Sequence, residues 1–144
     1  MTKVLLITPP FTQLNTPYPA TAYLKGFLNT KNIESHQCDL GIEVILQLFT
    51  KKNLSKLFDI VEQHNNLSVH AERMLVLKNK YLNSIENVIS FLQNKNPTLA
   101  NIIIDGDFLP ESSRFNEVED LEWAFGTLGI QDKAKHLATL FLED

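Results

Sequence analysis

Cysteine and glycine are scarce in this 144-residue sequence, which has one cysteine, Cys38, and five glycines. A single cysteine excludes an internal disulfide framework, a cysteine-rich zinc site and an all-cysteine iron–sulfur site within the chain. The G-x-G-x-x-G dinucleotide fingerprint and the P-loop motif are also absent, which disfavours NAD, FAD and ATP sites of those types. We expect Cys38 to be a small buried residue of a strand.

Positive charge and long apolar runs are in short supply as well. The 13 Lys and Arg residues are outnumbered by 17 Asp and Glu, and the net charge of -4 argues against a general nucleic-acid surface. No apolar run is long enough to cross a bilayer, and the apolar stretch near the start is too short for a signal peptide. The cytoplasm is therefore the expected compartment, with no membrane partner. The hydrophobic content of 44% is enough to build a core.

The first forty residues have the pattern of a β-α-β unit. Residues 3–8 are an uninterrupted apolar run, typical of a parallel strand buried on both faces, and Pro9-Pro10 ends it. A helix is expected from near Pro19 to about residues 30–32, because apolar residues recur there at helical spacing. Residues 33–40 are expected to form a second strand. A crossover of this length predicts that the two strands are parallel neighbours.

The rest of the chain is predicted to be mostly helical. Residues 97–104 could be a short helix started by Asn96-Pro97, but a strand over 101–104 is an open alternative. The stretch 105–116 contains Gly106 and Pro110 and is expected to be a loop. Apolar spacing predicts further helices over residues 42–49, 54–61, 69–94, 117–125 and 131–143.

These elements define an α/β fold class, a partial Rossmann-like β-α-β unit with parallel strands, followed by a mostly helical region. We expect the boundary near residue 50, with a Rossmann-like unit over 1–50 and a helical extension over 51–144. Two parallel strands are a poor sheet by themselves. We therefore expect the sheet to be completed beyond residue 144 of a longer parent chain or, as the less favoured alternative, by a partner chain. An open edge would also favour self-association of the isolated chain.

The candidate ligand site lies at the carboxyl ends of the two strands, where ligands bind in parallel α/β sheets. The loop from Thr8 to Tyr18 leaves the first strand there and contains Pro9, Pro10 and Thr12, and Asp39 ends the second strand. A ligand-free alternative is also open. The proline loop could merely turn the chain, and Asp39 could cap the helix that follows it.

No metal site and no catalytic constellation is predicted. The four histidines are dispersed, and His64 and His70 do not have the i, i+4 spacing of a shared helical face. Asp105, Asp107 and Glu111 form an acidic cluster near Arg114, for which we favour turn and cap chemistry over cation binding. No G-x-S-x-G motif is present. A stand-alone metal-dependent enzyme built on the acidic cluster is the least favoured alternative.

The expected first strand runs Lys3-Val4-Leu5-Leu6-Ile7-Thr8 into Pro9-Pro10, Pro17-Tyr18-Pro19-Ala20 opens a helix carrying Tyr23-Leu24, and the expected second strand ends Cys38-Asp39-Leu40. These segments resemble the N-terminal cobalamin-binding-like domain of bacterial B12-dependent radical SAM proteins. A later part, with Asp107-Phe108-Leu109-Pro110-Glu111, Arg114-Phe115 and Asp120-Leu121-Glu122-Trp123-Ala124-Phe125-Gly126, is similar to the same group. The resemblance touches most of the chain.

The resemblance implies a domain that positions a cofactor or caps the active site of a downstream barrel. Its cofactor-lining residues here would be Thr8, Pro9, Pro10, Thr12, Tyr18 and Asp39. The C-x-x-x-C-x-x-C cluster motif and the D-x-H-x-x-G cobalamin loop are both missing, and no histidine follows the first strand. The 4Fe-4S cluster and S-adenosylmethionine would therefore belong to the downstream parent chain, and this chain alone would not be catalytic. Cobalamin is compatible with the site but has no coordinating residue. The alternative function is a Rossmann-like protein-interaction or dimerisation module without a cofactor.

Overall fold

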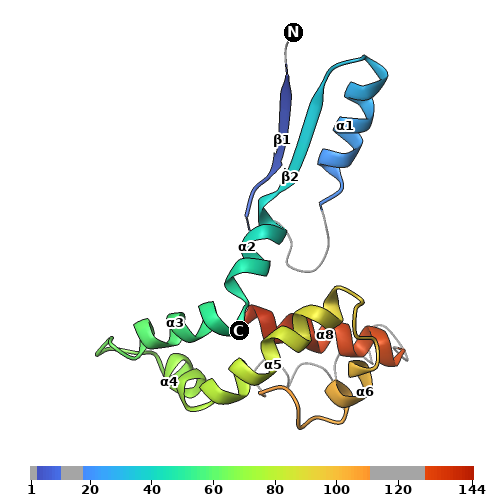
Figure 1. The fold of residues 1–144 in the computed structure, drawn as a ribbon. Helices are drawn as coiled ribbons and strands as arrows, with labels where there is room; N and C mark the ends of the chain where they lie inside the picture. The colour runs from blue at the N-terminus through green and yellow to red at the C-terminus, as the bar shows by residue number, and fades with distance from the viewer. Residues whose placement is uncertain (1–2, 11–17, 111–128) are drawn as a thin grey trace. The chain divides into compact units, whose positions relative to one another are not determined.

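The computed structural model describes residues 3–10, 18–110 and 129–144 (Figure 1). The chain divides into two compact units, Met1–Leu48 and Phe49–Asp144. The first contains β1 (Val4–Thr8), α1 (Ala20–Thr30), β2 (Ser35–Asp39) and α2 (Leu40–Leu48). The described elements of the second are α3 (Lys51–Val61), α4 (Val69–Val76), α5 (Lys78–Leu92), α6 (Leu99–Ile104) and α8 (Ile130–Glu143). The predicted α/β class, a parallel β-α-β unit followed by a mostly helical region, is confirmed.

The two strands pair in parallel, with Val4 opposite Ser35 and Thr8 opposite Asp39. Figure 1 shows β1 and β2 side by side, with α1 running alongside them as the crossover. Among the described residues this is a two-stranded sheet. β2 is shorter than the predicted strand over 33–40. The amide of Ile33 donates to the carbonyl of Leu28 in the reversal after α1, and Leu40 already begins α2.

The expectation that β1 is buried on both faces is wrong for this chain. Leu5 is 60% exposed and Ile7 48% exposed, whereas Val4 and Leu6 are half-buried and Thr8 is buried. Side chains alternate between the two faces of a strand, so one face is covered and the other open. A single crossover helix can cover only one face. The open face is apolar because it carries Leu5 and Ile7. Cys38, the register partner of Ile7, is only half-buried there.

Helix α1 lies on the covered face of the strand pair, but few of its own side chains are removed from solvent. Its Thr21 hydroxyl lies 3.5 Å from the Thr8 hydroxyl, which fixes the side of the sheet on which α1 lies. None of its residues is fully buried, and the aromatic residues Tyr23 and Phe27 are 79% and 59% exposed. Unit Met1–Leu48 therefore presents two apolar surfaces to its surroundings.

Asparagine reverses the chain after two helices. Asn32 follows α1 with φ 56°, and Asn94 follows α5 with φ 59°. In each case the next amide reaches back five residues, from Ile33 to the carbonyl of Leu28 and from Lys95 to that of Ser90. These are Schellman motifs, in which a left-handed residue ends the helix and satisfies its last carbonyls.

The predicted helix over residues 69–94 is two helices, which meet at Leu77. Leu75 and Leu77 both pack against the core of the second unit. Residues two positions apart do not share a face of a straight α-helix. At Leu77 the backbone (φ -91°, ψ 5°) departs from the helix, and the amide of Lys80 bonds the Leu77 carbonyl at 2.8 Å. The break lets both leucines face inward.

The other helical predictions that can be examined are confirmed. Residues 97–104 contain the helix α6, so the strand alternative over 101–104 is wrong. The expected helices over 42–49, 54–61 and 131–143 correspond to α2, α3 and α8. The predicted helix over 117–125 lies outside the described residues. Among the described helices, none combines the length and hydropathy that a membrane span needs.

The described part of the second unit has a hydrophobic core built around α5. Tyr81 of α5 stacks on Phe141 of α8, with ring centroids 5.3 Å apart, and meets Phe58 of α3 at 6.1 Å. Burying aromatic side chains of this size dominates the energetics of a small core. The fully enclosed side chains include Ile85, Val88 and Phe91 of α5 and Ile103 of α6.

Candidate functional site

The structure brings the predicted rim together at the carboxyl end of the strand pair. Thr8 and Asp39 are register partners, and Pro9 and Pro10 leave β1 at the same end. Both prolines are exposed, and Tyr18, just before α1, is 44% exposed. Thr12 lies outside the described residues. Four of the predicted residues, Thr8, Pro9, Pro10 and Asp39, thus share one edge of the sheet.

The polar groups of the rim already have partners inside the unit. The Thr8 side chain is buried, and its Oγ1 lies 3.5 Å from Oγ1 of Thr21. The backbone amide of Ile42 donates to Asp39 Oδ1 at 3.1 Å. That bond makes Asp39 the N-cap of α2. Of the two roles considered for Asp39 from the sequence, this is the capping role. The rim therefore offers a ligand mainly an exposed proline surface rather than free side-chain donors.

Elsewhere in the first unit, the ionic contacts lie at the opposite, amino end of the strands. Glu34, just before β2, accepts from Lys3 Nζ at 2.8 Å and lies 3.6 Å from His36 Nε2. All three side chains are well exposed, so these contacts contribute little to stability. They therefore lie away from the predicted rim at the carboxyl end, where Asp39 ends β2. Within the described ranges, no group of three His, Cys, Asp or Glu side chains could hold a metal ion.

The acidic cluster is divided by the structure. Asp105 ends α6, and Gly106 follows with φ 93°, a left-handed conformation that favours glycine. Glu111 and Arg114, the other predicted members, lie outside the described residues. Asp107 instead lines a cavity within the second unit.

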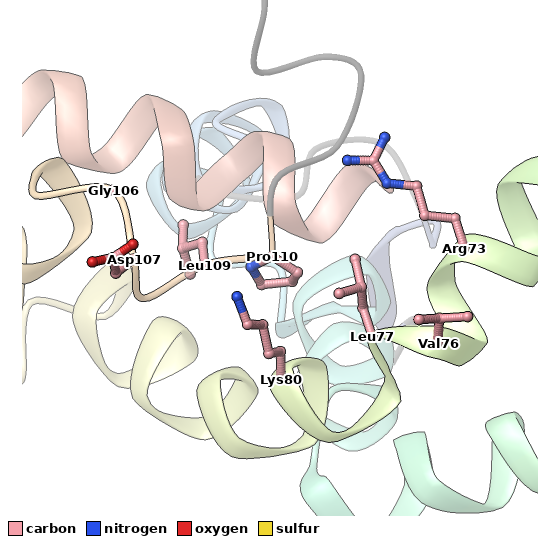
Figure 2. Close-up of a pocket in the computed structure, with 8 residues that line it drawn as sticks. All are labelled: Arg73, Val76, Leu77, Lys80, Gly106, Asp107, Leu109 and Pro110. Carbon is pink, nitrogen blue, oxygen red and sulfur yellow. The ribbon is translucent and has the colours of Figure 1, made fainter.

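That cavity is a site that sequence reasoning missed. It has a volume of about 420 Å³ and lies between the α4–α5 junction and the loop after α6 (Figure 2). Its walls are apolar at Val76, Leu77, Leu109 and Pro110, and its charged residues are Arg73, Lys80 and Asp107. The lining residues come from two segments some thirty positions apart. No local motif in the sequence could have indicated that they meet.

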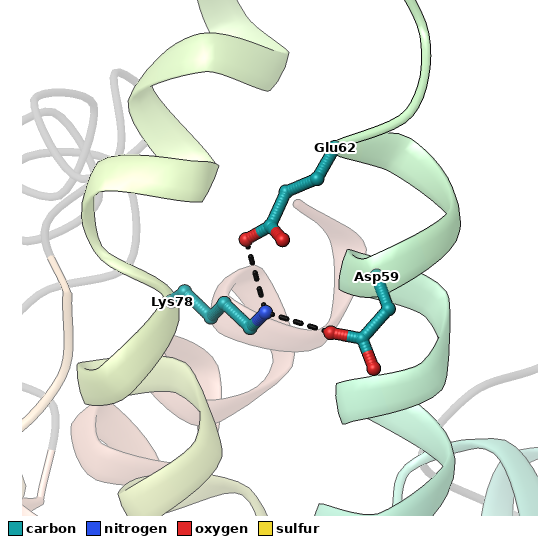
Figure 3. A network of polar contacts seen from close by, with 3 residues as sticks. All are labelled: Asp59, Glu62 and Lys78. Atoms are coloured by element: carbon teal, nitrogen blue, oxygen red, sulfur yellow. Dashed lines mark hydrogen bonds and ion pairs between the residues drawn. The ribbon is translucent and has the colours of Figure 1, made fainter.

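A second charged cluster joins α3 to the start of α5. The Lys78 ammonium donates to Asp59 Oδ1 and to Glu62 Oε1, both at 2.9 Å (Figure 3). Hydrogen bonds to Asp59 and then Glu62 raise the pKa of Lys78 above its ordinary value. The ammonium also lies 6.0 Å from the centroid of the Phe58 ring. The arrangement is a structural clamp in which one ammonium bridges two carboxylates.

No family model, curated protein or solved structure matches the chain.

Proposed function

We propose that this chain is the N-terminal cobalamin-binding-like domain of a radical SAM enzyme. It would position a cofactor or cap the active site of an iron–sulfur and S-adenosylmethionine barrel in the same polypeptide. The observation that carries the proposal is the register pairing of Thr8 with Asp39 at the carboxyl end of two parallel strands. In open α/β sheets this edge is where ligands bind. The di-proline exit from β1 and the Asp ending β2 are the features that this chain has in common with that domain.

The rim suits cobalamin because it offers an apolar surface to contact the cofactor, although it offers no side chain to coordinate the cobalt. Pro9, Pro10 and Tyr18 are exposed and largely apolar, which suits the broad face of a macrocycle. None of the described rim residues is a histidine, so these residues would offer the cobalt no imidazole ligand. Cobalamin, when bound, would supply cobalt-centred group transfer. The residues of this chain would hold and orient it, with Asp39 fixing the start of α2 beside it.

Titration with cobalamin, followed by its visible spectrum, tests the cofactor claim in the polypeptide that contains this chain. We expect a spectral change and retention of the corrinoid on gel filtration. Pro10→Glu places a charge on the rim and should abolish retention. Asn29→Glu adds the same charge on an exposed position near the C-terminal end of α1, away from the rim, and should leave retention unchanged. Equal retention by the two variants, or no spectral change in the unmodified protein, would remove cobalamin from the proposal.

The gene beyond residue 144 provides an independent test of the parent enzyme. A C-x-x-x-C-x-x-C motif in the same reading frame is the expected result, because the single cysteine here cannot hold the cluster. A reading frame without that motif would contradict the radical SAM assignment altogether.

A protein-interaction or dimerisation module is the second candidate, and one observation favours it. The open face of β1 exposes Leu5 and Ile7, and the outer surface of α1 exposes Tyr23 and Phe27. Apolar surfaces of this kind mark interaction sites more often than isolated apolar residues do. This function needs no cofactor, and its test is the state of association described in the Discussion.

A further inference from the structure

We propose that β1 pairs antiparallel with β1 of a second copy of this chain, so that two strand pairs join into one four-stranded sheet. The inference rests on the second candidate function, the dimerisation module, and names its partner and the strand that makes the contact. It is carried by the backbone groups on the outer edge of β1, a different feature from the apolar side chains of the open face.

The hydrogen-bonding pattern of the strand pair leaves two residues of β1 directed away from β2. The amide of Val4 donates to the carbonyl of Glu34 at 3.0 Å, so Val4 is bonded to β2. In a parallel pair, residues that bond the neighbouring strand alternate with residues that do not. Leu5 and Ile7 therefore direct their N–H and C=O groups to the outer edge. In the part of the chain that the structure describes, these groups have no hydrogen-bonding partner.

The outer edge of β1 lacks the features that protect edge strands. The segment Val4–Thr8 contains no charged residue and no proline, and its register with β2 runs without a bulge. Natural proteins use lysine, proline or a bulge to prevent an edge from pairing with another chain. The sequence of β2 is Ser-His-Gln-Cys-Asp, which favours a strand less than the Val-Leu-Leu-Ile-Thr of β1. We therefore assign the contact to β1.

A second copy fits this edge because its free backbone groups are symmetric about Leu6. A two-fold axis through Leu6 places Leu5 opposite Ile7 of the second copy in an antiparallel pair. Opposite residues of this kind exchange both N–H···O=C bonds, so the two such pairs use every free group of both edges. In a parallel ladder a bonded residue lies opposite an unbonded one, so two identical edges in register cannot pair that way. Closed two-fold dimers are the commonest soluble oligomers.

The side chains of the open face add apolar contact to these hydrogen bonds. The axis is normal to the sheet, so the exposed side chains of Leu5 and Ile7 in both copies lie on the same face. Opposite residues of antiparallel strands have Cβ atoms about 5 Å apart, close enough for direct packing. Each Leu5 thus packs against an Ile7 of the second copy, and removing this apolar surface from water stabilises the dimer.

Amide hydrogen exchange of the unmodified chain at low and high concentration tests the pairing, with sedimentation to measure the dimer. We expect the Leu5 and Ile7 amides to exchange roughly tenfold more slowly when about nine-tenths of the chains are dimeric, because only the monomer leaves them open. A monomer at every concentration would refute both this inference and the dimerisation module. A dimer whose Leu5 and Ile7 amides exchange as fast as in the monomer would refute the edge pairing alone.

A cysteine at the two-fold axis tests the register. Leu6 lies opposite Leu6 of the second copy as a non-hydrogen-bonded pair, with Cα atoms about 4.5 Å apart, within reach of a disulfide. In a Cys38→Ser background, Leu6→Cys should therefore give a covalent dimer under mild oxidation.

The matched control is Val4→Cys in the same background, on the same strand and equally half-buried. Val4 lies opposite Thr8 of the second copy, so the two Val4 positions are separated by about 13 Å along the strands and cannot be bridged. Equal cross-linking of the two variants, or none at Leu6, would contradict the proposed register.

Discussion

Thr8 and Asp39 face each other as Cα partners at the carboxyl end of the parallel strand pair, and each side chain has a hydrogen-bonding partner on a following helix. Thr8 meets Thr21 of α1, and Asp39 accepts from the amide of Ile42 in α2. The rim is therefore built from two helix attachments. Its capacity to bind a ligand depends on the stability of both.

Removing the Asp39 cap should loosen α2. Asp39→Ala is expected to cost about 1 kcal/mol, the usual effect of losing an N-cap, whereas Asp39→Asn keeps the acceptor and should cost little. Hydrogen exchange of the Ile42 and Ile45 amides measures the effect locally. Faster exchange in the Ala variant alone is the expected result. Unchanged exchange in both variants would mean that the hydrogen bond to Ile42 does not hold the helix.

The open face of β1 should drive self-association of this chain. Leu5→Thr combined with Ile7→Thr removes the exposed apolar side chains while keeping residues that favour strands. We expect sedimentation experiments to show concentration-dependent association of the unmodified chain and a monomeric double variant. Self-association of the double variant at the same concentration would show that the open face of β1 is not the association surface. It would also weaken the proposal of an interaction module.

The clamp at Lys78 should contribute stability that depends on salt and on pH. Lys78→Met leaves Asp59 and Glu62 as neighbouring like charges and should lower the melting temperature, most clearly at low ionic strength. The raised pKa of Lys78 means that the folded state holds this proton more tightly than the unfolded state. The contribution is therefore complete below the ordinary lysine pKa of 10.5 and is lost as pH rises above it.

The matched control for the clamp is Lys56→Met, on an exposed position of the same helix, α3. Its melting temperature should stay near that of the unmodified chain at every salt concentration. If both variants melt alike at low salt, the two carboxylates do not stabilise the fold through Lys78.

The Tyr81 phenol should lose its proton only at unusually high pH, and this should make the stability of the fold fall in alkaline solution. Burial, and then the negative charge of Asp144, raise the pKa of Tyr81 to about 12 from an ordinary value of 10.0. Between these two values the unfolded state loses the phenol proton and the folded state keeps it, so the free energy of unfolding falls as pH rises. Absorbance of tyrosinate should show one of the three tyrosines ionising near pH 12.

The substitution Tyr81→Phe separates the effect of the phenol hydroxyl on stability from the effect of the aromatic ring. The variant keeps the aromatic contact with Phe141 but has no proton to lose. Urea unfolding at pH 10 and pH 12 should therefore show a smaller loss of stability in the variant than in the unmodified chain. An equal loss in both would assign the alkaline sensitivity to other groups.

Local patterns predicted the elements well where one periodicity dominated. The apolar run before Pro9 and the crossover length to Asp39 were enough to predict two parallel strands, because right-handed crossovers leave few alternatives. The break at Leu77 could not be predicted from the apolar stripe. It depends on both Leu75 and Leu77 finding places in a core that only tertiary packing defines.

The exposure of β1 and the cavity in the second unit were also beyond sequence reasoning. An unbroken apolar strand is typical of burial on both faces, but Leu5 and Ile7 remain open where one helix covers the sheet. Lys80 and Asp107 are ordinary surface charges in the sequence. Only the folding of the 106–110 loop toward α5 puts them around one cavity.

The two asparagine reversals place one left-handed helix end in each unit. Asn32 belongs to the first unit and Asn94 to the second, and both hold left-handed backbone that glycine adopts without steric cost. A glycine at one position would remove the steric cost of the left-handed backbone at that helix end, in one unit only. The chain thus carries, at matching helix ends, a pair of sites for dissecting how independently its two halves unfold.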